Sequence, residues 1–114
     1  MELKRVVVTG LGALTPIGND VNSYWNSLLQ GVSGADYITH FNPEKFQTRF
    51  ACELKGFNVL DYLPGKEAQR MDPCAQYAMV SVMEALRDSG LVLDEMNKRR
   101  VGVIFGTGVG GFTS

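Results

Sequence analysis

Histidine, cysteine and proline are scarce in this chain, and net charge is almost absent. The 114 residues contain one His, two Cys and four Pro, and 11 basic against 12 acidic residues give a formal net charge of −1. Near-neutral charge argues against nucleic-acid binding, because phosphate contacts need a basic patch. The longest apolar run falls far short of the roughly 20 residues that a membrane-spanning helix requires. We therefore expect neither nucleic acid nor membrane as a partner.

The scarce side chains also limit metal, disulfide and nucleophile chemistry. Cys52 and Cys74 lack metal-type spacing, and we expect free thiols in a reducing compartment. Cys74 falls in the first turn of an apolar helix and Cys52 on the apolar face of a strand, so both are interpreted as inert core residues. His40 is interpreted as a hydrogen-bonded turn residue rather than a base for Cys74. The start of the chain, from Met1 to Gly10, is too short for a signal-peptide core and predicts a cytoplasmic protein.

What remains is an ordinary globular composition, with 45% hydrophobic and 20% charged residues. The length allows one modest domain. Short β-branched or apolar runs at 6–9 and 101–105 are typical of strands buried on both faces. Helical periodicity fills 21–29 and 73–88. The order of strand, helix, irregular insert, helix and strand predicts an α/β fold with a parallel sheet.

Both helices carry recognisable ends. Asn19 or Asp20 can cap the first helix, Gly31 ends it, and its apolar stripe is expected to lay Trp25 against a sheet. Asp72 and Pro73 begin the second helix, which has no charge between Pro73 and Met83. A helix that is apolar nearly all round is typical of the interior of a protein larger than this chain.

The stretch 32–65 is mostly irregular and contains one alternating run. This run predicts a half-buried strand with one apolar face, formed by Thr48, Phe50, Cys52 and Leu54. So long an irregular segment is unusual inside a small compact domain.

Two glycine loops follow the predicted strands. Gly106, Gly108 and Gly111 match the G-x-G-x-x-G pattern, so a dinucleotide site at residues 106–111 is one alternative. The first loop has Gly10 and Gly12 but Thr15 in the third position. Close backbone approach at the top of a parallel sheet is the preferred interpretation of both loops.

Two groups of basic residues stand out among the 11 in the chain. Lys66 and Arg70 are i, i+4 neighbours if 66–71 forms a helical turn, and both could meet an acidic partner. The run Lys98–Arg100 precedes a predicted strand and is interpreted as a solvated loop.

A series of short motifs, spread in order over nearly the whole chain, resembles the opening of the β-ketoacyl-acyl-carrier-protein synthases. The matching motifs are Arg5–Gly12, Thr15–Gly18, Trp25, Leu28–Leu29, Gly31, Ser33–Gly34, Lys66–Glu67, Met71–Asp72, Gln76–Ala78, Asp88–Leu91 and Gly106–Gly111. The set is most similar to the elongating type II enzymes of bacterial fatty acid synthesis, and polyketide ketosynthases share much of it. The resemblance implies a thiolase-like α/β fold of five alternating layers, α-β-α-β-α, with the helix from Pro73 between two sheets.

The implied reaction is decarboxylative Claisen condensation of acyl and malonyl groups that are carried on acyl carrier protein. The family's nucleophile is a cysteine in a Thr-Ala-Cys type motif, and two histidines assist it. Cys52, Cys74 and His40 do not match these motifs. We therefore expect residues 1–114 to be the N-terminal part of a longer synthase, without a catalytic residue and inactive alone.

The resemblance also implies two sites. Gly108 and Val109 align with the loop that borders the acyl-chain pocket near the dimer interface, where a branched aliphatic residue gates the pocket in type II enzymes. Lys66 and Arg70 align with basic positions that meet the acidic carrier protein, and Gln69 stands where the family often has Arg. No cofactor and no metal is expected, and the parent is expected to be a homodimer.

Overall fold

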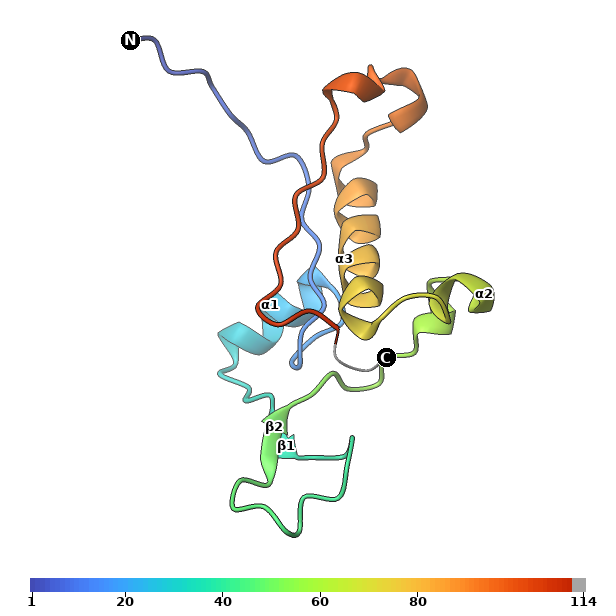
Figure 1. Cartoon of the computed structure of the whole chain (residues 1–114). Helices are drawn as coiled ribbons and strands as arrows, with labels where there is room; N and C mark the ends of the chain where they lie inside the picture. Colours follow the sequence, from blue (N-terminus) through green and yellow to red (C-terminus); the bar gives the residue numbers. More distant parts are fainter. Residues whose placement is uncertain (112–114) are drawn as a thin grey trace.

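The structure, a computed structural model, describes residues 1–111 and has one long central helix with shorter elements around it (Figure 1). Its principal extents are 56 × 37 × 31 Å. The helices are α1 (Val21–Leu29), α2 (Gly65–Ala68) and α3 (Pro73–Ser89), and the strands are β1 (Ala35–Tyr37) and β2 (Phe50–Cys52). Single 3-10 turns cover Val59–Asp61, Leu93–Glu95 and Lys98–Arg100.

Helix α3 begins and ends where the sequence predicts. Pro73 occupies the first turn, and Asp72 precedes it with extended backbone. The Asp72 side chain makes no capping hydrogen bond, so proline rather than a side-chain cap marks the start. The helix ends at Gly90, whose φ of +67° is a left-handed conformation that glycine adopts without strain.

Helix α1 also has the predicted caps, but not the predicted packing. The Asp20 carboxylate accepts the backbone N–H of Ser23 at 2.8 Å, and Gly31 follows the helix with φ +67°. Trp25 is 57% exposed, so the expectation that it lies against a sheet is wrong for residues 1–111. Leu28 and Leu29 of the same apolar stripe are 44% and 68% exposed, so residues 1–111 leave this face of α1 largely uncovered.

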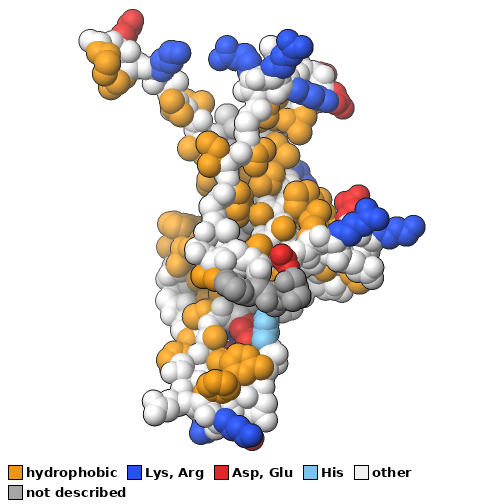
Figure 2. Space-filling model, in the orientation of Figure 1, with side chains coloured by type: hydrophobic (Ala, Val, Ile, Leu, Met, Phe, Trp, Pro, Cys, Tyr) orange, Lys and Arg blue, Asp and Glu red, His pale blue; other side chains and the backbone are white. Residues whose placement is uncertain are grey.

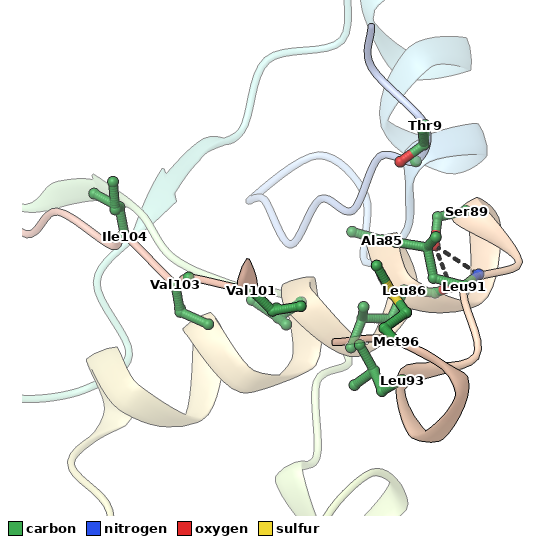
Figure 3. Close-up of a pocket in the computed structure, with 13 residues that line it drawn as sticks. Thr9, Ala85, Leu86, Ser89, Leu91, Leu93, Met96, Val101, Val103 and Ile104 are labelled. Atoms are coloured by element: carbon green, nitrogen blue, oxygen red, sulfur yellow. Dashed lines mark hydrogen bonds between the residues drawn. The ribbon is translucent and has the colours of Figure 1, made fainter. Parts of the chain in front are cut away.

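The predicted parallel sheet does not form within residues 1–111. Its two expected strands, 6–9 and 101–105, are unpaired, and the one sheet here is the antiparallel pair β1–β2. The segment 101–105 runs along α3, whereas 6–8 leads away from it (Figure 1); Thr9, residues 101–104 and α3 help to line a cavity of about 390 Å³ (Figure 3). A strand needs a neighbour for its backbone N–H and C=O groups, and neither segment has one within residues 1–111.

Strands β1 and β2 form a small hairpin in which Ala35 pairs with Cys52 and Tyr37 with Phe50. The predicted strand shortens to three residues, and its faces are reversed. Phe50 and Cys52 are exposed, whereas Ala51 between them is half-buried. The expectation of a core Cys52 is therefore wrong, because the hairpin lies away from α3 and nothing within residues 1–111 covers its apolar face (Figure 1).

The buried core is small. Among the described residues, the buried hydrophobic side chains are Ile38, Leu63, Ala68 and Val80. Val80 is the one buried residue of α3, so the helix that is apolar nearly all round is only partly covered. No helix in residues 1–111 has the length and apolar character needed to cross a membrane.

Candidate functional site

The first glycine loop lies directly on α3. A Cβ atom built on Gly10 would stand 2.2 Å from the carbonyl oxygen of Ala85, and one on Gly12 would stand 1.9 Å from that of Ser81. No real side chain tolerates such distances, so only glycine allows this contact. The interpretation of close backbone approach is correct for this loop, and the surface approached is the helix.

Two carboxylates of α3 hold the same loop. Leu11 donates its backbone N–H to Asp88 Oδ2 at 2.9 Å, and Ala13 donates to Glu84 Oε2 at 2.9 Å. The spacing explains the fit: two extended residues span roughly 6.6 Å, and four helical residues rise about 6 Å. The other oxygen of Glu84 accepts the backbone N–H of Val21 at 2.8 Å, at the start of α1. The N–H groups of Leu11 and Ala13 are therefore already bonded within the chain.

The second glycine loop is more open. A Cβ on Gly106 or Gly108 would meet nothing within 4 Å, while Gly110 has φ +78° and donates its N–H to the Thr107 hydroxyl at 3.0 Å. Val109 is 76% exposed. The loop folds back on α3, because a Cβ on Gly111 would collide with the Asp72 carboxylate.

An apolar cavity of about 480 Å³ lies beside this loop. The first turns of α3 and the residues just before Gly108 line it; they are Cys74, Ala75, Tyr77, Ala78, Phe105, Gly106 and Thr107. Its size is within the range of small-molecule pockets. Gly108 and Val109 do not line this cavity; they follow its last lining residue, Thr107, in the chain, at the start of the predicted acyl-pocket loop.

The basic pair predicted to meet a carrier protein lies at α2. Lys66 is inside the four-residue helix and Arg70 lies two residues beyond it, with the N–H of Arg70 bonded to the carbonyl of Glu67. Both side chains belong to exposed residues, and neither forms an ion pair with any residue in 1–111. Basic side chains project into solvent from this part of the molecule (Figure 2).

Cys74 and His40 are not brought together into a catalytic pair. Cys74 is half-buried in the first turn of α3, whereas His40 lies beyond β1 with its ring exposed. The backbone N–H of His40 is bonded to Glu53 at 3.3 Å, which agrees with a hydrogen-bonded turn residue.

Glu53 is the acceptor that ties this turn together. The Thr39 hydroxyl donates to its carboxylate at 2.8 Å, and that bond is the main cause that lowers the pKa of Glu53. His40 Nε2 stands 3.9 Å from the same group. The arrangement joins the end of β1 to the residue that follows β2.

The basic run Lys98–Arg100 contacts residues close to it in the chain. Lys98–Arg100 forms a 3-10 turn rather than an irregular loop, and its residues are exposed as predicted. Lys98 pairs with Asp94 at 2.9 Å. No group of three or more metal-ligating side chains occurs in the described part of the chain.

Comparison with known proteins identifies the family. Residues 3–114 match the family model of the beta-ketoacyl synthase N-terminal domain. The chain therefore belongs to the beta-ketoacyl synthase family. It is 49% identical over 108 residues to 3-oxoacyl-[acyl-carrier-protein] synthase 2 of Staphylococcus aureus (strain COL), and 48% identical over 111 residues to the protein of that name from Vibrio cholerae.

Solved ketosynthase structures agree in fold. The ishigamide ketosynthase/chain length factor superposes with a TM-score of 0.69 and 34% identity, over 79% of this chain and 22% of that one. A type II polyketide ketosynthase, solved with its acyl-carrier protein and bound to the hexaketide, gives 0.61 and 26% identity, over 80% of this chain and 23% of that one. The fold is thiolase-like α/β, as predicted.

The matches cover most of this chain but a minor part of its relatives. The Staphylococcus aureus match takes in 95% of this chain and 26% of that protein, and the Vibrio cholerae match 97% and 27%. The chain thus spans about a quarter of the length of the curated relatives it matches. Family membership favours the synthase interpretation of the loop 106–111 over the dinucleotide alternative.

Sequence reasoning missed two residues that organise this region, Glu84 and Gln76. Glu84 and Asp88 are an i, i+4 carboxylate pair on a helix whose first half has no charge, and this pattern was the available signal for the loop contact. Gln76 is part of a matched motif, yet nothing in its neighbours along the chain indicates its partners, the carbonyl oxygens of Ala68 and Met71.

Proposed function

We propose that this chain is the N-terminal part of a 3-oxoacyl-[acyl-carrier-protein] synthase II that elongates fatty acids. The observation that carries this proposal is the 48–49% identity to synthases of that name over nearly all of the chain. In the proposed reaction the malonyl thioester loses CO2, and the carbanion left at its α-carbon attacks the acyl thioester carbonyl and expels the thiolate. The acyl and malonyl groups arrive on acyl carrier protein, which is the partner.

Residues 1–114 contribute surfaces to this reaction and no nucleophile. Gly108 and Val109 would border the acyl chain, and their place in the chain, directly after Thr107 of the apolar cavity beside α3, supports that role. Lys66 and Arg70 would dock the acidic carrier protein. Their exposure and lack of ion pairs within residues 1–111 support that role, since both charges remain available to a partner. We also propose that the parent is cytoplasmic and a homodimer.

The direct test uses the full-length parent with acyl- and malonyl-loaded carrier protein. We expect one condensation per acyl chain, with one CO2 released and a 3-oxoacyl-carrier protein two carbons longer, measured by mass spectrometry. The chain 1–114 alone should give no product. A parent that forms no carbon–carbon bond from these substrates would contradict the proposal.

A polyketide-type ketosynthase is the second candidate. The names of the two structural relatives support it, since one is a ketosynthase/chain length factor and the other belongs to a type II polyketide system. The same assay separates the two functions. Repeated condensations without reduction, seen as products longer by several two-carbon units, would favour the polyketide enzyme, whereas a single addition favours fatty acid elongation.

Charge reversal tests the docking surface. In the full-length enzyme, Lys66→Glu combined with Arg70→Glu should raise the KM for acyl-carrier protein about tenfold or more, because opposed charges become like charges. The turnover number at saturating carrier protein should stay unchanged. An unaltered KM would refute the assignment of this surface.

The acyl-pocket role of Val109 has its own test. Val109→Phe fills space at the loop and should shorten the acyl chains that the full-length enzyme accepts, compared across a series of acyl-carrier proteins. An unchanged chain-length profile would contradict the role of Val109 as a gate.

A further inference from the structure

The amide side chain of Gln76 attaches the segment that carries Lys66 and Arg70 to α3. We call residues 57–71 the docking arm. The Gln76 side chain donates from Nε2 to the carbonyl oxygen of Ala68 at 2.9 Å and to that of Met71 at 3.3 Å. Both N–H bonds of this amide are therefore used. The two carbonyls lie at and just beyond the end of α2, and that of Ala68 also accepts the backbone N–H of Met71 at 3.2 Å.

The other end of the docking arm contacts Tyr77, the residue that follows Gln76 in α3. The ring of Tyr77 meets that of Phe57 edge-on, with centroids 5.6 Å apart, and Phe57 stacks on Tyr62 at 5.7 Å. Between these two attachments, Leu63 and Ala68 are 6% and 3% exposed, among the most buried residues described. Gln76 and Tyr77 thus hold the arm at both ends.

The arm needs such attachment because its helix is too short to hold itself. Helix α2 has four residues, and isolated helices shorter than about 12 residues are marginal in water. Lys66 and Arg70 stand on either side of Ala68, whose carbonyl Gln76 binds. Loss of that bond leaves the end of α2 held by its own backbone hydrogen bonds alone, so the distance between the two cations becomes less fixed.

We propose that Gln76 is a positioning residue for carrier-protein docking, which acts by holding the end of α2 so that Lys66 and Arg70 present a fixed pair of positive charges. The inference rests on the proposed function of that pair. Gln76 is half-buried, and both N–H groups of its amide are directed at backbone carbonyls of the arm. Its effect on the partner is therefore indirect.

The test compares two substrates in the full-length enzyme. Gln76→Met keeps the length of the side chain and removes both donors. We expect the KM for acyl-carrier protein to rise about three- to tenfold, as expected when a steering charge pair loses its fixed geometry. The kcat and the activity toward a small acyl-pantetheine thioester, which has no carrier protein to dock, should not change. Gln30→Met is the matched control, because the Gln30 side chain makes no hydrogen bond within residues 1–111, and it should leave every value unchanged.

Amide hydrogen exchange supplies an independent readout. Gln76→Met should speed the exchange of the amides of 67–70 about tenfold or more relative to the parent, while the centre of α3 keeps its protection. Unchanged exchange in 67–70 would overturn the inference, and so would faster exchange with an unchanged KM. If Gln76→Met lowers the yield of folded protein, Gln76→Asn, one carbon too short to reach both carbonyls, replaces it with the same expectations.

The charge-reversal variant distinguishes the two levels of the proposal. If Lys66→Glu with Arg70→Glu raises the KM and Gln76→Met does not, the positioning role fails and the docking surface stands. If charge reversal leaves the KM unchanged, the docking surface itself fails, and the positioning role fails with it.

Discussion

The segments that α3 holds by hydrogen bonds differ sharply from the two apolar segments 6–9 and 101–105. The loop after Gly10 and the docking arm meet α3 through Glu84, Asp88 and Gln76, with donor–acceptor distances of 2.8–3.3 Å. In contrast, Val6 is 88% and Ile104 99% exposed, although both lie in runs typical of buried strands. The polar anchors find their partners within residues 1–111, and the apolar runs do not.

This contrast shows which contacts residues 1–111 can complete among themselves and which need other parts of the parent. A carboxylate or amide needs one or two groups at about 2.9 Å, and a single helix can supply them. Burial of a β-branched strand needs neighbours on both faces and both edges. Since the curated relatives are about four times as long as the matched part, we expect the cover for these runs to come from the rest of the parent.

The largest loss of stability is expected at Gly12, where the loop comes closest to the backbone of α3. In the full-length protein, Gly12→Ala should lower the free energy of unfolding by about 3 kcal/mol, because the new Cβ would collide with the backbone of Ser81 and push the loop off the helix. Denaturant unfolding measures the change. Gly65→Ala is the control, since its Cβ meets only Leu60 at 3.7 Å, and it should change stability by less than about 0.5 kcal/mol. Equal losses of stability from the two substitutions would contradict the close packing of Gly12 against α3.

The next largest loss of stability is expected on removal of the Glu84 carboxylate, which accepts two backbone N–H groups. Glu84→Ala leaves the N–H groups of Ala13 and Val21 without their partner and should cost about 2 kcal/mol of stability. Glu95→Ala serves as control, because Glu95 is exposed and its side chain makes no hydrogen bond within residues 1–111. A loss no greater than that of the control would show that the carboxylate does not anchor the loop.

The apolar runs give a smaller but more diagnostic effect. Ile104→Thr should cost about 1–2 kcal/mol in the full-length parent, where we expect Ile104 to be covered, because a buried ethyl group is exchanged for a hydroxyl. Thermal unfolding of the parent and its variant measures it. A change below about 0.5 kcal/mol, the usual value for an exposed site, would mean that the run stays uncovered.

The smallest effect concerns the local cap of α1. The backbone N–H and hydroxyl of Ser23 bind Asp20 and lower its pKa. A lowered folded-state pKa stabilises the protein above the unfolded value, about 3.9, and this stabilisation is lost as the pH falls through the folded value. Asp20→Ala should therefore cost about 1 kcal/mol at pH 7.

The pH dependence of that cost is the check on the mechanism. The difference in unfolding free energy between parent and Asp20→Ala should be constant from pH 7 to about 5 and shrink below about pH 4, as the carboxylate is protonated. A difference that does not vary with pH would assign the effect to helix propensity rather than to the charged cap.

Much of the local structure was predictable. The limits of α1 and α3 follow from Asp20, Pro73 and the glycines Gly31 and Gly90, and the structure confirms them. The exposed Lys66 and Arg70 were found from spacing and resemblance. The burial of the segments 6–9 and 101–105 in a parallel sheet and the buried face of β2 were predicted wrongly, because each assumed covering elements that residues 1–111 do not contain.

The sequence by itself determined the helix limits, the glycine turns and the family, since caps and left-handed glycines act within about four residues and the motifs occur in the family's order. Only the tertiary structure decided that Glu84 binds amides 71 and 63 residues away, and that Gln76 holds the end of α2. Such contacts depend on the path of the chain between the partners. The sequence alone does not distinguish a carboxylate or amide that faces solvent from one that anchors a distant loop.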